Sequence, residues 1–179
     1  VDVPWPVIAS DSNALRRAMT EGMATTSDAT ASNALIIRPY STTTLVFSQS
    51  MMDDFNSRAA TLSIAGLPSG TTMILKNEAV GEYISKGYEH FTMQGTNAGT
   101  YIFQDFVLWG GTDASSPGKG GIKATGGDIQ LDHVAFRYMK SKAVTGTGTL
   151  NVSGCVFRDF AESSVIAESQ VTIDNSLFS

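Results

Sequence analysis

The feature of this 179-residue sequence that most constrains its fold is an apolar pattern that recurs at a constant interval towards the C-terminal end. The pattern begins at Ile129 ("IQLDHVAF"), Leu150 ("LNVSGCVF") and Val171 ("VTIDNSLF"), so the two intervals are equal. Short runs of alternating apolar residues are typical of strands, and a fixed period of about 20 to 50 residues, a range that includes this interval, is typical of repeat architectures. The pattern therefore predicts a solenoid in which equivalent residues of successive coils lie on top of one another.

Each of the three runs loses its alternation at one pair of residues: Asp132-His133, Ser153-Gly154 and Asp174-Asn175. The second residue of each pair is His, Gly or Asn, residue types that adopt a positive φ more readily than most. A single left-handed residue bends a strand and resets its alternation. We therefore predict a corner of the coil at each pair, followed by an internal ladder of Phe136, Phe157 and Phe178.

Earlier coils follow the same pattern less regularly. The run "YIFQDFVL" from Tyr101 fits, but its distance to the next run, at Ile129, is longer than the regular interval, and the additional residues fall in 109–121 ("WGGTDASSPGKGG"). The Gly, Pro, Ser and Asp residues of this segment predict a protruding loop. Strand pairs in "NALIIRPYSTTTLVF" and "ATLSIAGLPSGTTMIL" extend the pattern back to about residue 33, for about six coils in all.

The N-terminal segment differs from the repeats. Residues of about 10–25 carry apolar side chains at helical spacing, which predicts an amphipathic helix. Such a helix would cover the core that a solenoid exposes at its first coil. We expect one domain over 1–179, with the capping helix at about 10–25 and coils over about 33–179 that are most regular from 120 onward. Because the sequence stops in mid-coil, we expect it to be a fragment of a longer chain.

Two stretches resemble known families. The segment "NALRRAM", followed by the strand pair "ALIIRPYSTTTLVF", resembles the start of right-handed parallel β-helix proteins of the pectin-lyase-like superfamily. The repeats "GGIKATGGDIQLDHVAFRYMKSKAV" and "GTLNVSGCVFRDFAESSVI" resemble polymorphic outer-membrane-protein type adhesins, although Gly120-Gly121-Ile122 lacks the Ala of their first box and Phe136–Met139 lacks the Asn of their second. The resemblance implies an all-β, right-handed, single-stranded parallel β-helix at the cell surface or outside the cell.

Composition excludes several classes of function. The formal net charge is −5 and the Lys and Arg residues are scattered, so we expect no nucleic-acid partner. No apolar run approaches the ~18 to 20 residues of a spanning helix, so we expect no membrane insertion in this segment. One Cys and two His residues do not suit a zinc site, and we expect neither a metal nor another cofactor.

Outward carboxylates are the first candidates for chemistry. Enzymes with the β-helix fold place such groups on a strand face, often with calcium, to cleave acidic polysaccharides. Asp132 and Asp174 lie two coils apart, which corresponds to ~9.6 Å at the strand spacing, near the upper limit of ~9.5 Å for an inverting pair. Each Asp also precedes a predicted left-handed residue, where its side chain commonly makes a local turn hydrogen bond, and we favour that role.

Four residues are candidates for ligand binding. Arg137 and Arg158 occupy equivalent positions one coil apart and could bind anionic sugars, or pair with nearby acidic residues such as Asp159. Trp109 and Tyr138 could form stacking platforms for glycans, or pack at coil corners. The sequence leaves both alternatives open.

Two further residues carry weaker signals. Asn151 begins a glycosylation sequon, Asn-Val-Ser, and faces outward in the predicted strand. Cys155 falls in the inward register, where we expect a buried thiol that behaves as a small hydrophobe.

These observations favour a non-enzymatic role. We expect an extracellular or cell-surface scaffold, structural or adhesive, that presents loops or assembles laterally. Its partner would be a cell-surface glycan, a protein or another copy of itself. The alternative is a polysaccharide lyase or glycoside hydrolase that acts on acidic polysaccharide, and only this alternative would call for calcium. Ice or crystal-surface binding is a further alternative, but the stretch "TGTGTL" is not repeated one coil later.

Overall fold

A computed structural model describes residues 7–9, 24–26, 34–37, 43–47, 61–65, 69–78, 82–84, 89–94, 99–162, 166–167 and 170–179. These residues form strands, turns and loops, and none of them lies in a helix. Within this part of the chain there is accordingly no helix long and apolar enough to cross a membrane. The predicted capping helix lies outside the described residues, except that residues 24 and 25 belong to a strand.

The strands form three sheets. In order across each sheet, sheet A contains β1 (Val7–Ala9), β4 (Thr43–Phe47), β6 (Thr72–Asn77), β9 (Thr100–Gln104), β12 (Asp128–Asp132), β15 (Thr149–Ser153) and β18 (Gln170–Asp174). Sheet B contains β2 (Ala24–Thr26), β3 (Ala34–Ile37), β5 (Thr61–Ala65), β8 (Phe91–Gln94), β11 (Ile122–Ala124), β14 (Val144–Thr145) and β17 (Ile166–Ala167). Sheet C contains β7 (Glu82–Ile84), β10 (Val107–Trp109), β13 (Ala135–Arg137), β16 (Val156–Arg158) and β19 (Leu177–Phe178).

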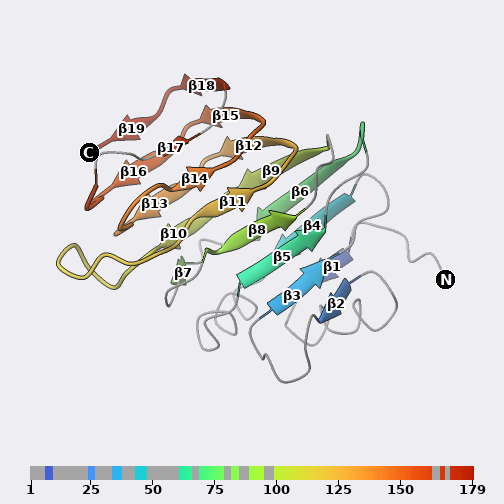
Figure 1. Ribbon diagram of the computed structural model, residues 1–179, viewed down its shortest axis with the longest axis horizontal. Helices are drawn as coiled ribbons and strands as arrows, with labels where there is room; N and C mark the ends of the chain where they lie inside the picture. Colours follow the sequence, from blue (N-terminus) through green and yellow to red (C-terminus); the bar gives the residue numbers. More distant parts are fainter. Residues whose placement is uncertain are drawn as a thin grey trace.

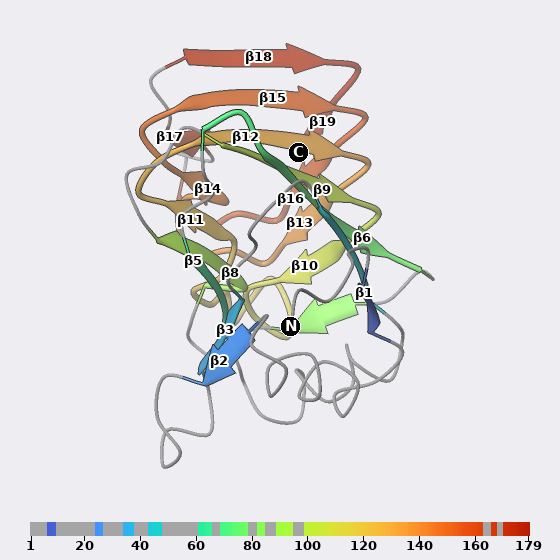
Figure 2. The ribbon, with the colours of Figure 1, turned by 90° about the vertical axis from the view of Figure 1, so that its right-hand side faces the viewer.

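The chain passes through the sheets in a fixed order. From β5 onward it visits sheets B, A and C in turn through five rounds, and each strand pairs in parallel with its equivalent in the next round (Figure 1). The view in Figure 2 shows β12, β15 and β18 stacked above one another. The pair β2–β3 is antiparallel. The part of the chain that the structure describes is therefore all-β with parallel pairing from β3 onward, as predicted, and its winding is compatible with a β-helix.

The register confirms the repeating pattern. Ile129 pairs with Leu150 and Leu150 with Val171. In sheet C, the rings of Phe136, Phe157 and Phe178 form the predicted ladder, with centroids 5.1 and 4.6 Å apart and interplanar angles of 8° and 6°. Equivalent residues of successive rounds therefore contact one another directly.

The predicted corners are also present. His133, Gly154 and Asn175 have φ values of 54°, 60° and 46°. Asp105, which occupies the equivalent position one round earlier, has a φ of 60°. The break in alternation is thus a left-handed residue between a strand of sheet A and a strand of sheet C.

A second left-handed corner was not predicted. Tyr138 and Asp159 have φ values of 53° and 58°. Tyr138 directly follows Arg137 and Asp159 directly follows Arg158, and these two Arg residues are register partners at the ends of β13 and β16. This corner turns the chain out of sheet C.

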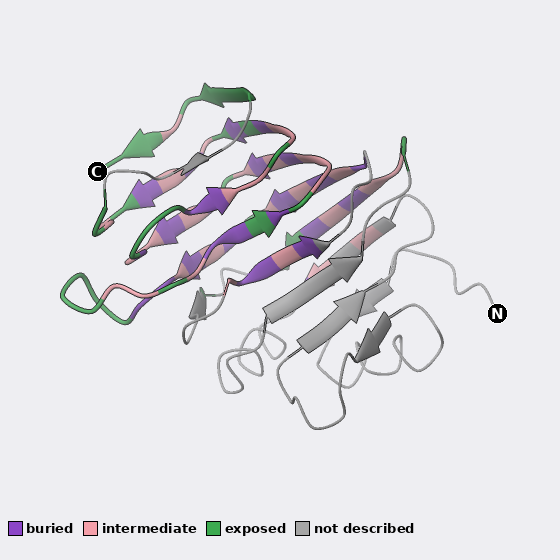
Figure 3. Ribbon diagram, viewed as in Figure 1, coloured by how far each residue is buried: buried purple, intermediate pink, exposed green. Residues whose placement is uncertain are grey.

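The core lies between the sheets. Inward and outward residues alternate along the strands, so buried and less buried positions alternate along the ribbon in Figure 3. The largest fully buried side chains are all aromatic: Tyr101, Phe47, Phe91, Phe103, Phe106, Phe136 and Phe157.

The last round exposes residue types that earlier rounds bury. Ile173 and Phe178 are 47% and 44% exposed, whereas their register partners Val152 and Phe157 are 2% and 1% exposed. Figure 3 accordingly shows β18 and β19 as exposed. The core of this round is covered on one side only.

Candidate ligand-binding site on the outer face of sheet C

The candidate site is a row of outward side chains on sheet C. Trp109 pairs with Arg137, and Arg137 pairs with Arg158, so the three residues follow one another across β10, β13 and β16. Each follows a fully buried residue of its strand, which places its own side chain on the opposite, outer face. Three of the four predicted ligand-binding residues therefore lie side by side.

Tyr138 joins this row through its ring. The centroids of Trp109 and Tyr138 are 5.1 Å apart, with an interplanar angle of 79°, an edge-to-face contact. The left-handed turn at Tyr138 follows Arg137 directly. The indole Nε1 of Trp109 is buried, and no hydrogen-bond partner for it is present among the described residues. The described residues thus hold an aromatic pair whose indole N–H is buried and has no hydrogen-bond partner among them.

The two Arg residues of the row differ in their partners. Arg158 Nε lies 3.5 Å from Asp159 Oδ2, and the side chain of Arg158 is exposed whereas that of Asp159 is partly buried. The ion-pair alternative is therefore confirmed for Arg158. Arg137 is half-buried and makes no salt bridge within the part of the chain that the structure describes. Arg137 is thus the cation of the row whose charge is not already paired there.

A row of apolar side chains lies beside the candidate site. Each of these residues comes directly before the inward-facing residue of its sheet C strand, and each pairs with its equivalent in the next strand. They are Val107, Ala135, Val156 and Leu177. The outer face of sheet C therefore combines an apolar row with a row that holds an aromatic pair and a guanidinium group.

The loop of residues 110–121 borders the aromatic end of the row. The Gly110 amide donates to the Arg137 carbonyl at 2.9 Å, and the Gly118 amide donates to the Tyr138 carbonyl at 3.0 Å. The segment has no strand and protrudes between β10 and β11 (Figure 1), which confirms the predicted loop except at its first residue, Trp109, which belongs to β10. Both arms of the loop are therefore tied to the residues that carry the candidate ligand-binding side chains.

The tip of the loop has its own hydrogen-bond network. Asp113 accepts bonds from the Ser115 hydroxyl at 2.6 Å and from the Ser115 and Ser116 amides at 2.9 Å each. The Ser115 hydroxyl is the main cause that lowers the pKa of Asp113 below its usual value. These bonds are local turn contacts of the kind that Asp commonly makes.

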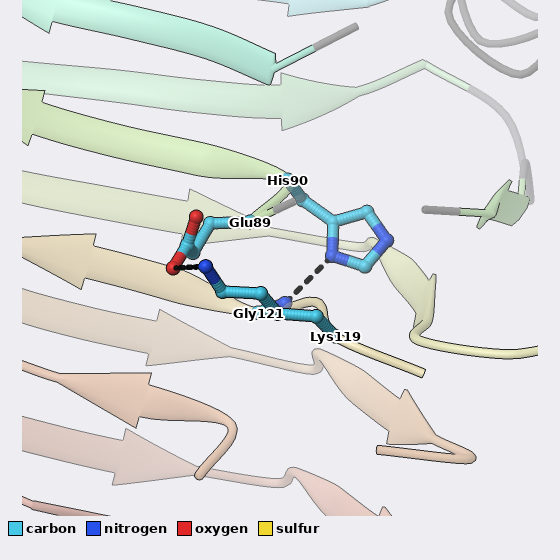
Figure 4. Close-up of polar contacts among 4 residues, drawn as sticks. All are labelled: Glu89, His90, Lys119 and Gly121. Atoms are coloured by element: carbon cyan, nitrogen blue, oxygen red, sulfur yellow. Dashed lines mark hydrogen bonds and ion pairs between the residues drawn. The ribbon is translucent and has the colours of Figure 1, made fainter. Parts of the chain in front are cut away.

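His90 joins the two ends of the loop. Its Nδ1 lies 2.8 Å from the Gly121 amide and its Nε2 lies 3.1 Å from the Trp109 carbonyl (Figure 4 shows the Gly121 bond). The ring is 1% exposed. A backbone amide can only donate and a carbonyl can only accept, so Nδ1 is unprotonated and Nε2 carries the hydrogen. The sequence indicated only that two His residues were too few for a metal site, and His90 had no other predicted role.

Glycine is required where the loop ends. Gly121 has a φ of 91°, and a Cβ there would lie 2.1 Å from the Ala143 carbonyl oxygen. A Cβ on Gly120 would lie 2.8 Å from Cε1 of His90. The Gly120-Gly121 pair thus permits the close approach of the loop to the imidazole ring.

An ion pair lies at the same base. Glu89 Oε1 is 3.1 Å from Lys119 Nζ (Figure 4). Burial raises the pKa of Glu89, but hydrogen bonds from its own backbone and from Lys119, together with the charges of Lys119 and Lys123, outweigh burial and leave the pKa below its usual value. Glu89 is therefore held in its charged form.

The outward face of sheet A carries the predicted catalytic candidates. Asp132 and Asp174 are both register partners of Ser153, so they lie two strands apart. The Asp132 carboxylate accepts hydrogen bonds from the amides of Gln104 at 3.3 Å and Gln130 at 3.1 Å, in place of the expected turn bond. Within the described residues no group of three or more His, Cys, Asp or Glu side chains could hold a metal ion.

The two remaining candidates lie as the strand pattern predicts. Asn151 is exposed on β15. Cys155 is 1% exposed, and its burial raises the pKa of the thiol. The Cys155 thiol contacts the carbonyl oxygens of Leu131 and Ser153 at 3.6 and 3.3 Å. Cys155 is therefore a buried, protonated thiol.

Comparison with known proteins found no matching family model, no matching curated protein and no matching solved structure.

Proposed function

We propose that this chain is an extracellular or cell-surface adhesive scaffold, a right-handed single-stranded parallel β-helix, that binds an acidic glycan on the outer face of sheet C. The observation that carries the proposal is the row of Trp109, Arg137 and Arg158 with the ring of Tyr138 against Trp109. The cyclic order of the sheets and the stacked Phe ladder support the β-helix. The resemblance of the repeats to cell-surface adhesins supports the location.

The residue types of the row suit an acidic sugar. A partly exposed aromatic ring, such as Trp109 or Tyr138, can contact the apolar face of a pyranose ring. A guanidinium group binds a carboxylate or sulfate through two parallel hydrogen bonds. Three positions at the strand spacing of ~4.8 Å extend the row over ~10 Å along the stack. An extended oligosaccharide that runs along the stack would therefore contact the aromatic pair and Arg137 together.

Calorimetric titration with hexagalacturonate tests the proposal. Because a hydrogen bond to a charged group contributes about 1.5–3 kcal/mol, Arg137→Gln is expected to weaken binding by roughly tenfold to a hundredfold. Arg158→Gln is the matched control, and its effect is expected to be smaller because Asp159 already pairs with Arg158. Trp109→Phe, which keeps an aromatic ring but reduces its area, is expected to weaken binding without unfolding the chain.

Two results would count against the proposal. Equal losses of affinity in Arg137→Gln and Arg158→Gln would show that the ion pair of Arg158 does not distinguish the two residues. Equal affinity for hexagalacturonate and a neutral cello-oligosaccharide would show that the protein does not recognise the charge of the glycan. Release of unsaturated or reducing ends during the titration would support the enzymatic alternative. Asp132→Asn and Asp174→Asn would then test whether this pair carries the activity.

A further inference from the structure

The two ends of the 110–121 loop meet at one side chain. His90 accepts a hydrogen bond from the Gly121 amide, where the loop ends, and its Nε2 bonds the carbonyl of Trp109, where the loop begins. The carbonyl of Gly121 in turn accepts a bond from the His90 amide at 2.8 Å. Trp109 also belongs to the aromatic pair of the candidate site, so one imidazole ring links the base of the loop to the ligand-binding row.

This arrangement requires the neutral imidazole. A protonated ring carries hydrogen on both nitrogens, so Nδ1 would face the Gly121 N–H with a second donor at 2.8 Å. His90 is 1% exposed, so a hydrogen on Nδ1 could not donate a hydrogen bond to water while the ring stays in its present position. Protonation therefore requires the loop base to open or the ring to leave its site.

The structure describes three charged groups in the segments next to His90. Among the described residues, the charged groups of the neighbouring segments are Glu89, which precedes it, Lys119 on the loop and Lys123 on β11. Glu89 is already paired with Lys119 at 3.1 Å. Trp109, Gly120 and Gly121, which contact the ring or approach it closely, carry no ionisable side chain. The described surroundings of His90 thus hold one carboxylate, which is paired with Lys119, and two cations.

We propose that His90 is a pH-sensitive clamp, a positioning residue whose neutral form holds the loop base and Trp109 in the ligand-binding arrangement and whose protonation releases them. Histidine is the side chain that ordinarily changes charge between about pH 5 and 8, so acidification across that interval is the condition that tests the release. The expected change in ligand affinity rests on the proposed function. The opening of the loop does not, since it is a property of the free protein.

The experiment follows the loop and the ligand separately. A Trp5→Phe background leaves Trp109 as the only Trp of the chain, and its fluorescence and the hydrogen exchange of the Gly121 amide are measured from about pH 7.5 to pH 5 without ligand. We expect a fluorescence transition and faster Gly121 exchange on acidification. Hexagalacturonate affinity, measured at both ends of the range, is expected to fall at least tenfold.

Two variants assign the response to one ring. His90→Asn keeps an acceptor near the position of Nδ1 but does not titrate, so its fluorescence, exchange and affinity are expected to be independent of pH. His133→Asn removes the other His, which is exposed at a left-handed corner that Asn tolerates, and is expected to keep the full response. In that variant the NMR titration of the single remaining imidazole is expected to share its midpoint with the loop transition, which tests the clamp even if His90→Asn does not fold.

The outcomes separate the clamp from the proposed function. A flat fluorescence and exchange profile in the wild type, a response that survives in His90→Asn, or one that disappears in His133→Asn would each overturn the clamp. A His90-dependent loop transition in a protein that binds hexagalacturonate at neither pH would establish the clamp and refute the acidic-glycan proposal.

Discussion

Replacement of Phe157 by Ala tests the internal ladder most directly. Phe157 is 1% exposed and lies between two nearly parallel rings, Phe136 at 5.1 Å and Phe178 at 4.6 Å. Removal of this ring leaves a gap between two rounds of strands and separates the remaining rings of the ladder. Among the described residues, Phe157 is the one member of the Phe ladder that stacks on a Phe ring on each side.

The expected cost follows from these contacts. A buried Phe→Ala change costs about 3–5 kcal/mol, and each aromatic pair adds about 0.5–1.5 kcal/mol beyond burial, so Phe157→Ala is expected near the upper end of that range. Phe178→Ala is the matched control, since Phe178 is 44% exposed and stacks on one ring of the ladder. We expect its cost to be about 1–2 kcal/mol, close to that of a partly buried apolar side chain.

Urea unfolding, followed by circular dichroism, measures both costs. The m-value is compared with that of the wild type, because solenoids can unfold in parts and a reduced m-value would show that the variant has lost rounds rather than stability. If Phe157→Ala costs no more than Phe178→Ala at equal m-values, the stacked ladder does not stabilise the fold as argued.

Two further predictions concern the corners and the thiol. Gly121→Ala is expected to destabilise the chain far more than Gly154→Ala, because a Cβ on Gly121 meets the Ala143 carbonyl at 2.1 Å whereas one on Gly154 meets the movable His133 ring at 3.0 Å. Equal urea midpoints for the two variants would contradict this. Cys155 is buried with a raised pKa, so its reaction with a thiol reagent is expected to be slow until urea unfolds the chain. Rapid labelling of the native protein would refute the buried assignment.

The stacked part of the fold could be predicted from the period alone. A residue at one position of a solenoid contacts its equivalents one period before and after it, so each position must satisfy the same packing requirement in every round. This is why the Phe ladder and the corner at His133, Gly154 and Asn175 are visible in the sequence. The corner at Tyr138 and Asp159 has no such repeated signal, because Asp159 is of a residue type enriched at positive φ but its equivalent one round earlier, Tyr138, is not.

The candidate site was only partly predictable. Trp109, Tyr138, Arg137 and Arg158 were each identified as possible ligand-binding residues, but their proximity was not. The longer interval that separates Tyr101 from Ile129 also separates Trp109 from Arg137, and the regular interval then leads from Arg137 to Arg158. The intervals between the repeats therefore already implied that these three residues are register partners. Applying the intervals of the sheet A strands to the sheet C strands would have placed Trp109, Arg137 and Arg158 in one row.

The role of His90 could not be predicted in this way, for a physical reason. Its bonds reach Trp109, 19 residues away, and Gly121, 31 residues away. The second separation is that of the register partners Phe91 and Ile122 in the one round that carries the insertion, and the first corresponds to no register pair. Both partners are backbone groups at the ends of the insertion, so their positions depend on how the loop folds rather than on their side chains. A repeat predicts the contacts that every round shares. Where one round departs from the others, as at the 110–121 loop, the polar groups released from the repeating pattern need partners of their own, and a buried polar side chain beside the insertion is the group best placed to provide them.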